Sequence, residues 1–342
     1  MSAPAGRAWL PGAILIILGA AAVALVQALL SGYLVTLASI ALIYVMLAVS
    51  LQVTNGLTGL FSLGHPAFMT IGAYVAAILT YPARRKGFMM PELPELLATQ
   101  EWNLLPAMLL GALAATLSAL VVGVSVLRLK GHYLAVATLG LIIIVRVVIN
   151  NQDGYTRGGL GLSGVARLTD LWWVYAWTVL AIYVAWRIKH ASLGRAMLAI
   201  RENEMAARCM GIDAFRTRLL AFVIGAFFAG IAGALMVHLV SVITPGSYGI
   251  PLAFNLVVIV VIGGTGSITG AIVAAIAISL LGEALKPIEE ALELYGLSQV
   301  LIALGLIAVL RLRPQGLFGS GEPPLRLWRT AEVASSSWPP GG

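Results

Sequence analysis

Ten apolar segments, with very few charged side chains in their interiors, constrain this chain more than any other feature. They lie at residues 10–31, 33–54, 65–80, 104–127, 132–150, 170–187, 218–241, 251–264, 268–283 and 296–311. A helix needs roughly 20 apolar residues to cross a bilayer. With only 10% charged residues in 342, the chain cannot cover a water-exposed surface. The pattern predicts an all-α, polytopic membrane protein with about 8–10 transmembrane segments, some broken or re-entrant.

The shorter segments and the chain ends set the predicted boundaries. The pair near 251–283 fits either two spans or one re-entrant hairpin. Residues 1–318 are predicted to form one transmembrane domain, with a cytoplasmic loop at 188–217. The tail at 319–342 is rich in Pro, Ser and Gly and is predicted to be disordered.

Basic residues in the connecting segments predict the orientation, because Lys and Arg are enriched in cytoplasmic loops. Basic clusters occur at 128–130, 187–218 and 311–329, and all three fall on one side if the spans alternate. That side is predicted to be cytoplasmic, and both termini lie on it. The Glu-rich connector 283–293 falls outside. The basic run 84–86 also falls outside, against the rule. These loops explain the net charge of +7 without nucleic-acid binding.

Neither an enzyme active site nor a cofactor or metal site is predicted. The chain has no G-x-x-x-x-G-K-[ST] motif for ATP phosphates. A G-x-G-x-x-G sequence at 159–164 lies in a loop that we expect to be flexible, without the preceding strand of a dinucleotide site. Cys209 is the single cysteine, and the four histidines lack metal-ligand spacing. Mid-span Asp and Glu are absent, so we expect the energy for any transport to come from another chain.

Two glycine-rich stretches with related sequences interrupt the apolar pattern. Residues 56–62 and 263–269 both read G-x-T-G-x-x-[ST]. Unwound backbone at membrane depth is tolerated where it lines a cavity or is buried in protein, and paired interruptions point to a substrate path. A buried structural turn explains the pattern equally well. The candidate substrate-path residues are Asn55, Gly56, Thr58, Gly59, Ser62, His65, Gly264, Thr265, Gly266 and Ser267.

The basic loop at 188–217 is patterned as two short amphipathic helices. Ser192 is predicted to cap a helix that runs through Arg201. Asn203 is predicted to cap a second helix, with Glu204 in its first turn and Gly211 just past its end. Such a pair suits docking onto a soluble partner, or alternatively binding to anionic lipid headgroups.

This loop resembles the cytoplasmic coupling loop of ABC importer permeases, whose signature is E-A-A followed three residues later by Gly. Here the sequence from Glu204 to Gly211 matches with one inserted residue. Further stretches resemble the LivM-type branched-chain amino-acid permease family, and the resemblance runs in order over residues 35–318. They are "GLTGLFSLGHPAFMTIGAYVAA", "LRLKGHYLAVATLGLIIIVRVVINN", "SLGRAMLAIRENEMAARCMGI" and "VVIVVIGGTGSITGAI".

The resemblance implies a subunit of a larger assembly in the bacterial inner membrane. A second homologous permease would complete the pore, two cytoplasmic ABC ATPase subunits would supply the energy, and a periplasmic substrate-binding protein would deliver the solute. The implied substrates are leucine, isoleucine and valine or related amino acids. Urea, short amides or aromatic acids are alternatives, and an ATP-independent channel is an alternative of another class. The candidate ATPase-coupling residues are Ser192, Gly194, Arg195, Arg201, Glu204, Ala206, Ala207 and Gly211.

Overall fold

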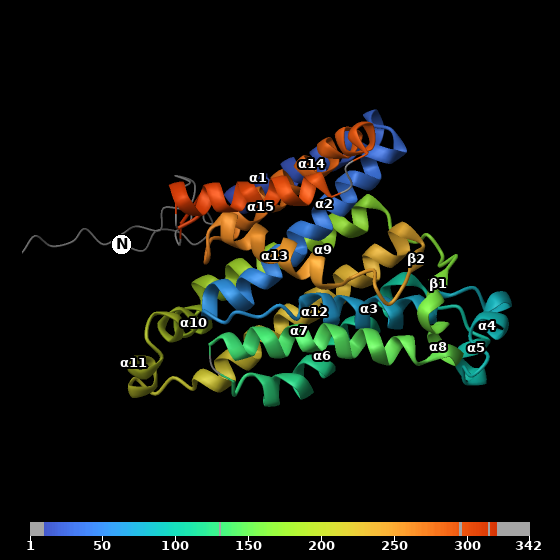
Figure 1. Ribbon diagram of the computed structural model, residues 1–342, viewed down its shortest axis with the longest axis horizontal. Helices are drawn as coiled ribbons and strands as arrows, with labels where there is room; N and C mark the ends of the chain where they lie inside the picture. Colours follow the sequence, from blue (N-terminus) through green and yellow to red (C-terminus); the bar gives the residue numbers. More distant parts are fainter. Residues whose placement is uncertain (1–9, 130, 294–295, 314, 320–342) are drawn as a thin grey trace, which may run out of the picture.

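The computed structural model describes residues 10–129, 131–293, 296–313 and 315–319, and a helix falls on each of the ten predicted segments (Figure 1). The ten are α1 (Leu10–Leu29), α2 (Gly32–Leu51), α3 (His65–Thr80), α6 (Leu104–Val126), α7 (His132–Asn150), α9 (Leu171–His190), α12 (Ala214–Val240), α13 (Ile250–Gly263), α14 (Ile268–Leu292) and α15 (Leu297–Leu312). A π-helical turn, η2 (Gln52–Gly56), continues α2.

Short elements fill the connections. They are α4 (Ala83–Met89), α5 (Glu95–Ala98), α8 (Asp153–Thr156), the 3-10 turn η3 (Gly158–Leu160), α10 (Ser192–Glu202), α11 (Glu204–Cys209), and the strands β1 (Leu162–Ser163) and β2 (Val242–Ile243). The strands pair antiparallel, with Leu162 opposite Ile243. The loop at 159–164, expected to be flexible, therefore contains a 3-10 turn and a paired strand.

Six helices in the described ranges are long and apolar enough to cross a membrane: α2 with η2, α6, α7, α9, α12 and α14. The number rises to seven if α3 and α4, which meet at a bend of 119°, form one span. Three further apolar helices, at 17–29, 250–263 and 297–312, are shorter. These helices confirm the prediction of an all-α, polytopic membrane protein with broken segments.

The helix that contains the predicted segment 268–283 is longer than predicted. Residues 283–292 of the predicted connector belong to α14, which continues to Leu292 and includes Pro287. Most of this stretch is Glu, Leu and Ala, of which Glu and Leu are good helix formers and Ala the best, and Lys286 pairs with Glu283 one turn earlier at 2.6 Å. The chain leaves the helix at Glu293, which adopts a left-handed conformation.

The core is centred on α12, which packs against α3 and α6 through small residues. A Cβ on Gly233 would lie 2.0 Å from the Met69 carbonyl oxygen, and one on Gly72 would lie 2.5 Å from Cα of Gly230. Both substitutions would drive a side chain into the backbone of the neighbouring helix. Glycine at these positions therefore allows close helix contact.

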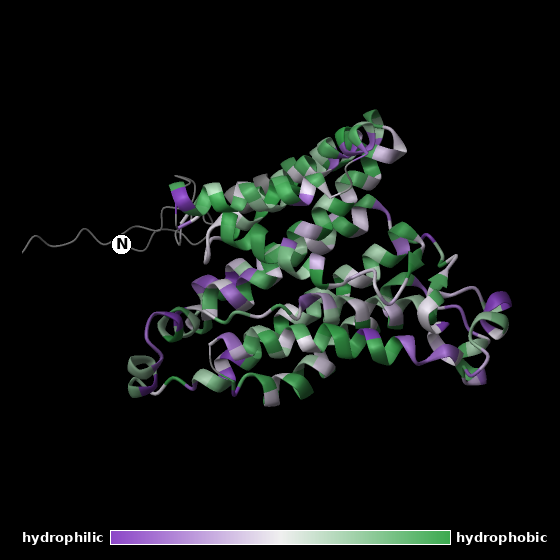
Figure 2. Ribbon diagram, viewed as in Figure 1, coloured by the Kyte–Doolittle hydropathy of each residue, from purple (hydrophilic) through white to green (hydrophobic). Residues whose placement is uncertain are grey.

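The polar elements gather at the two ends of the helix bundle (Figures 1 and 2). One end carries α10 and α11, and the opposite end carries α4, α5, α8 and the two strands. Between them the helices are mainly hydrophobic. The basic loop 188–217 and the basic run 84–86 therefore lie at opposite ends.

Candidate functional site

The two glycine-rich stretches lie against each other beside the end of the bundle that carries α10. Gln52, in the π-helical turn before the first stretch, donates from Nε2 to the carbonyl oxygens of Gly264 (2.6 Å) and Ser267 (2.8 Å). A Cβ on Gly56 would lie 2.9 Å from the Gly266 amide nitrogen. Glycine at position 56 thus permits direct backbone contact between segments about 200 residues apart.

Arg201 of α10 joins both stretches to the amphipathic helix pair. Its Nη1 donates to the carbonyl oxygens of Gly56 (2.7 Å) and Thr265 (3.2 Å), and its Nη2 to Thr265 Oγ1 (3.4 Å). Gly59, at φ +70°, leaves room for it, since a Cβ there would lie 3.1 Å from Arg201 Cγ. We call the contact of Gln52, Gly56, Arg201, Gly264 and Thr265 the break junction.

Positively charged side chains at the break junction bind backbone carbonyl oxygens near helix ends. The last carbonyls of a helix lack intrahelical donors and form the negative end of its dipole, so cations are favourable there. Both η2 and α13 end at this point. Arg201 supplies one cation, and Lys189 supplies another by donating from Nζ to the Gly266 carbonyl oxygen (2.6 Å). The freed carbonyls are therefore bound by positive side chains of the basic loop.

The remaining candidates of the first stretch form a folded turn. The side-chain amide of Asn55 makes two hydrogen bonds with the backbone of Ser62. Its Nδ2 donates to the Ser62 carbonyl oxygen (2.9 Å), and its Oδ1 accepts from the Ser62 amide (3.2 Å). Thr58 donates to the carbonyl oxygen of Thr54, and Thr58 and Ser62 are both fully buried. In this conformation the turn is closed, and a role in the substrate path stays a prediction for these residues.

His65 begins α3 and differs from the other buried histidine. Its side chain is 1% exposed, and neither ring nitrogen has a hydrogen-bond partner among the described residues. His238, by contrast, contacts Thr80 Oγ1 (2.6 Å) and the Ala234 carbonyl oxygen (2.6 Å) through its two ring nitrogens. His238 is thus a hydrogen-bonded structural residue, while the His65 ring lies beside Gly225 of α12 with both nitrogens unpaired among the described residues.

The predicted helix pair is present, with one cap displaced. Ser192 is the first residue of α10 rather than its cap, and the cap position is Ala191, which makes no side-chain capping bond. Asn203 caps α11 as predicted, accepting from the Ala206 amide at 3.1 Å. Gly211 follows α11 at φ +81°.

The end of α11 is a Schellman motif. The Gly211 amide donates to the Arg208 carbonyl oxygen (2.9 Å) and the Ile212 amide to that of Ala207 (3.1 Å). Gly194 packs α10 closely on α9, because a Cβ there would lie 2.1 Å from the Ile188 carbonyl oxygen. Arg195 and Ala206 are exposed, and Ala207 is buried. The candidate coupling residues thus lie on two well-defined helices.

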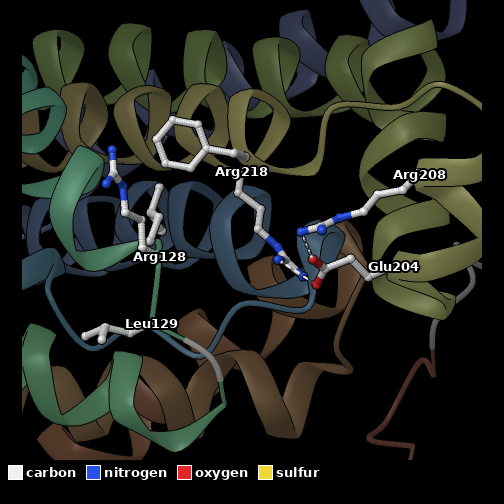
Figure 3. A pocket seen from close by; sticks show the side chains of 7 residues that line it. Arg128, Leu129, Glu204, Arg208 and Arg218 are labelled. Carbon is white, nitrogen blue, oxygen red and sulfur yellow. Dashed lines mark hydrogen bonds and ion pairs between the residues drawn. The ribbon is translucent and has the colours of Figure 1, made fainter.

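Glu204 ties α11 to α12 with an ion pair to Arg218 (2.9 Å), and it also pairs with Arg208 (2.5 Å) within α11. Partial burial tends to raise its pKa, but the hydrogen bond and charge of Arg218, together with those of Arg208, outweigh it and hold the pKa of Glu204 below its ordinary value. The three side chains border a pocket of about 360 Å³. Figure 3 shows Arg208 and Arg218 converging on Glu204, with Arg128 across the pocket.

Sequence reasoning missed Gln52 and Lys189. Gln52 is a lone amide near the end of an apolar run, which is a usable signal, because an unpaired amide there would be costly. Lys189 was one of many cations in the basic loop, and nothing in its position distinguished it. The structure also places the substrate-path candidates Gly56 and Thr265 in contact with the coupling candidate Arg201, which the sequence had assigned to separate sites.

A bundle with six candidate spans in the described part of the chain and two glycine-rich breaks defines a polytopic helical membrane protein. The family model for the permease component of the branched-chain amino acid transport system matches residues 33–310. The chain belongs to this family.

Three relatives illustrate the similarity. The high-affinity branched-chain amino acid transport permease LivM of Escherichia coli K12 is 31% identical over 86% of this chain and 72% of its own length. BraD of Pseudomonas aeruginosa is 27% identical over 82% of this chain and 92% of its own. LivH of E. coli K12 is 25% identical, with the same coverage as BraD. No solved structure matches.

Proposed function

We propose that this chain is a permease subunit of an ABC importer that moves leucine, isoleucine and valine across a bacterial inner membrane. Family membership supports the transport role, and the names of the relatives support the solute class. ATP hydrolysis takes place on two cytoplasmic partner subunits, and a periplasmic binding protein delivers the solute. Similarity to both LivM and LivH of one organism supports a second, homologous permease as partner.

In this proposal the end of the bundle with α10 and α11 faces the cytoplasm. Three basic clusters favour that orientation. The helix pair then presents exposed Arg195 and Ala206 toward the ATPases. Both termini of the chain lie on the same side.

The observation that best supports coupling is Arg201, a residue of the helix pair that hydrogen-bonds the backbone of both glycine-rich stretches. Motion of α10, driven by closure of the ATPase dimer, would act on two backbone segments at once. A coupling route requires such a shared element, whose arrangement both sites influence. Bound ATP and delivered substrate would favour different arrangements of the break junction.

The test is ATP hydrolysis by the complete complex in proteoliposomes, with and without loaded binding protein. Hydrogen bonds to charged groups contribute about 1.5–3 kcal/mol each. We therefore expect Arg201→Ala to reduce the substrate stimulation of hydrolysis by about tenfold or more, with leucine uptake falling in parallel. Arg201→Lys, which keeps the charge and loses the planar fork, should give an intermediate result.

Arg187→Ala is the matched control. Arg187 is an exposed arginine in the last turn of α9, at the same end of the bundle, and its side chain makes no hydrogen bond or ion pair to a described residue. The complex with Arg187→Ala should retain the substrate stimulation of ATP hydrolysis. Equal stimulation in the Arg201→Ala and Arg187→Ala complexes would contradict the coupling role. Competition of labelled leucine uptake by valine, urea or an aromatic acid then separates the proposed solute from the alternatives.

A further inference from the structure

We propose that the pocket between α11, the start of α12 and the turn after α6 binds the phosphate headgroup of an anionic phospholipid. This basic pocket measures about 360 Å³ and is drawn in Figure 3. Its lining consists of four charged and three apolar side chains: Arg128, Glu204, Arg208, Arg218, Leu127, Leu129 and Phe215.

The side chains of the basic pocket carry a net positive charge that an added anion would balance. Its three guanidinium groups face one carboxylate, that of Glu204, which pairs with Arg208 and Arg218. Arg128 is exposed and has no ion-pair or hydrogen-bond partner in the described part of the chain. Arg218 retains a buried Nε without an acceptor there. A phosphodiester would supply both the missing charge and acceptor oxygens.

The apolar part of the lining favours a phospholipid over a purely polar anion. Leu127 is buried, Phe215 is half-buried, and Leu129 is 43% exposed. A carboxylate from a soluble partner would need only the arginines. A phospholipid also carries a glycerol backbone and the first methylenes of its acyl chains, whose burial against leucine and phenylalanine is favourable.

The basic pocket also lies at the ends of two candidate membrane spans, where lipid headgroups would be. The candidate span α6 ends at Val126, directly before Leu127, and the candidate span α12 begins at Ala214, directly before Phe215. In Figure 1, α11 lies farther out than these helix ends. A basic pocket between the ends of membrane helices is the chemical match for an anionic headgroup.

Occupancy would affect the coupling helices, and this consequence rests on the proposed function. Glu204 and Arg208 belong to α11, which we place at the ATPase contact. A bound phosphate would neutralise the excess positive charge between α11 and α12 and hold α11 against the membrane. Coupling would then depend on the anionic lipid content of the bilayer.

The experiment measures lipid retention on the purified full-length chain by native mass spectrometry, after exposure to phosphatidylglycerol or phosphatidylcholine with identical acyl chains. We expect preferential retention of phosphatidylglycerol. One basic residue near a membrane surface contributes about 1 kcal/mol, so Arg128→Gln should weaken this retention about fivefold. Arg187→Gln, an exposed arginine outside the basic pocket, should not change it.

Two further measurements distinguish a phospholipid from inorganic phosphate and from an acidic side chain of a partner protein. Leu129→Gln should weaken retention of phosphatidylglycerol while leaving competition by inorganic phosphate unchanged, because only the lipid contacts the apolar wall. Equal retention of the two lipids, or no difference between Arg128→Gln and Arg187→Gln, would overturn the proposal. So would an Arg128→Gln variant that keeps its lipid but loses association with the ATPases, because the occupant would then be an acidic side chain. Retention on the isolated chain requires no ATPase, so failure of the proposed coupling would leave this result unaffected.

Discussion

Lys86 is the buried cation of the basic run 84–86, which lies at the end of the bundle predicted to face outside. Its ammonium group is fully buried and donates to the carbonyl oxygens of Leu79 (3.1 Å), Leu97 (2.9 Å) and Gln100 (2.6 Å). These carbonyls belong to the end of α3 and to the segment around α5. Lys86 therefore closes the connection between two spans, and its charge serves this turn rather than the orientation of the chain.

We expect Lys86→Met to destabilise this connection by about 1.5–3 kcal/mol, the range for a hydrogen bond to a charged group. The methionine keeps most of the side-chain volume but leaves the Leu97 and Gln100 carbonyls without their donor. Thermal unfolding of the purified protein should begin at a lower temperature. Arg84→Met removes a neighbouring exposed cation and is the control. Equal unfolding temperatures for the two variants would show that the buried ammonium is dispensable.

Residues that act across long sequence separations could not be predicted from the sequence. Asn203 and Gly211 were predictable as caps, because capping depends on three or four neighbouring residues. Arg201 was named as a coupling residue, yet its contacts with Gly56 and Thr265 span 145 and 64 positions. A single sequence holds no signal for such pairings beyond the residue types themselves.

At the scale of elements, hydropathy located the helices, since burial in lipid is decided locally by about 20 residues. The hydropathy pattern predicts the end of α14 too early, because the charged residues that follow position 283 indicate a connector rather than a helix. Helix propensity and the Glu283–Lys286 pair extend that helix nonetheless. Charged residues can continue a helix beyond its apolar part, and α14 also accommodates Pro287 before it ends at Leu292.

The attachment of α11 to α12 should depend on pH through Glu204. Its folded-state pKa is lowered, so its ion pair with Arg218 stabilises the attachment fully above the ordinary value of 4.5. The contribution disappears as the pH falls through the lowered folded-state pKa. Because this pair is partly exposed, we expect it to contribute about 1 kcal/mol to the free energy of the attachment. Its loss should lower the hydrogen-exchange protection of α11 about fivefold.

Amide hydrogen exchange measured from neutral pH to below pH 4.5, and corrected for the intrinsic exchange rate, tests this prediction. Glu204→Gln should lower protection of α11 at neutral pH and remove its pH dependence. Glu202→Gln changes an exposed glutamate at the end of α10 and should behave as wild type. A pH-dependent α11 in the Glu204→Gln variant would assign the effect to another group.

On the scale of the whole molecule, the two glycine-rich stretches are closed against each other rather than open as a filter. Gly56 touches the backbone at Gly266, Gln52 bridges the two stretches, and Thr58 and Ser62 are buried. A solute path through this junction requires the stretches to separate. Their hydrogen bonds to Arg201 and Lys189 link that separation to movement of the basic loop.

The isolated chain should therefore fail to conduct leucine. In liposomes that contain this chain alone, labelled leucine should enter no faster than in protein-free liposomes, because each opening would break several charge-assisted hydrogen bonds without an energy source. Liposomes with the complete complex, binding protein and ATP should accumulate leucine, and the same complex without ATP is the control. Saturable flux through the chain alone would favour the channel alternative. A higher flux in a Gly56→Val variant, whose side chain would force the two stretches apart, would then place the path at the break junction.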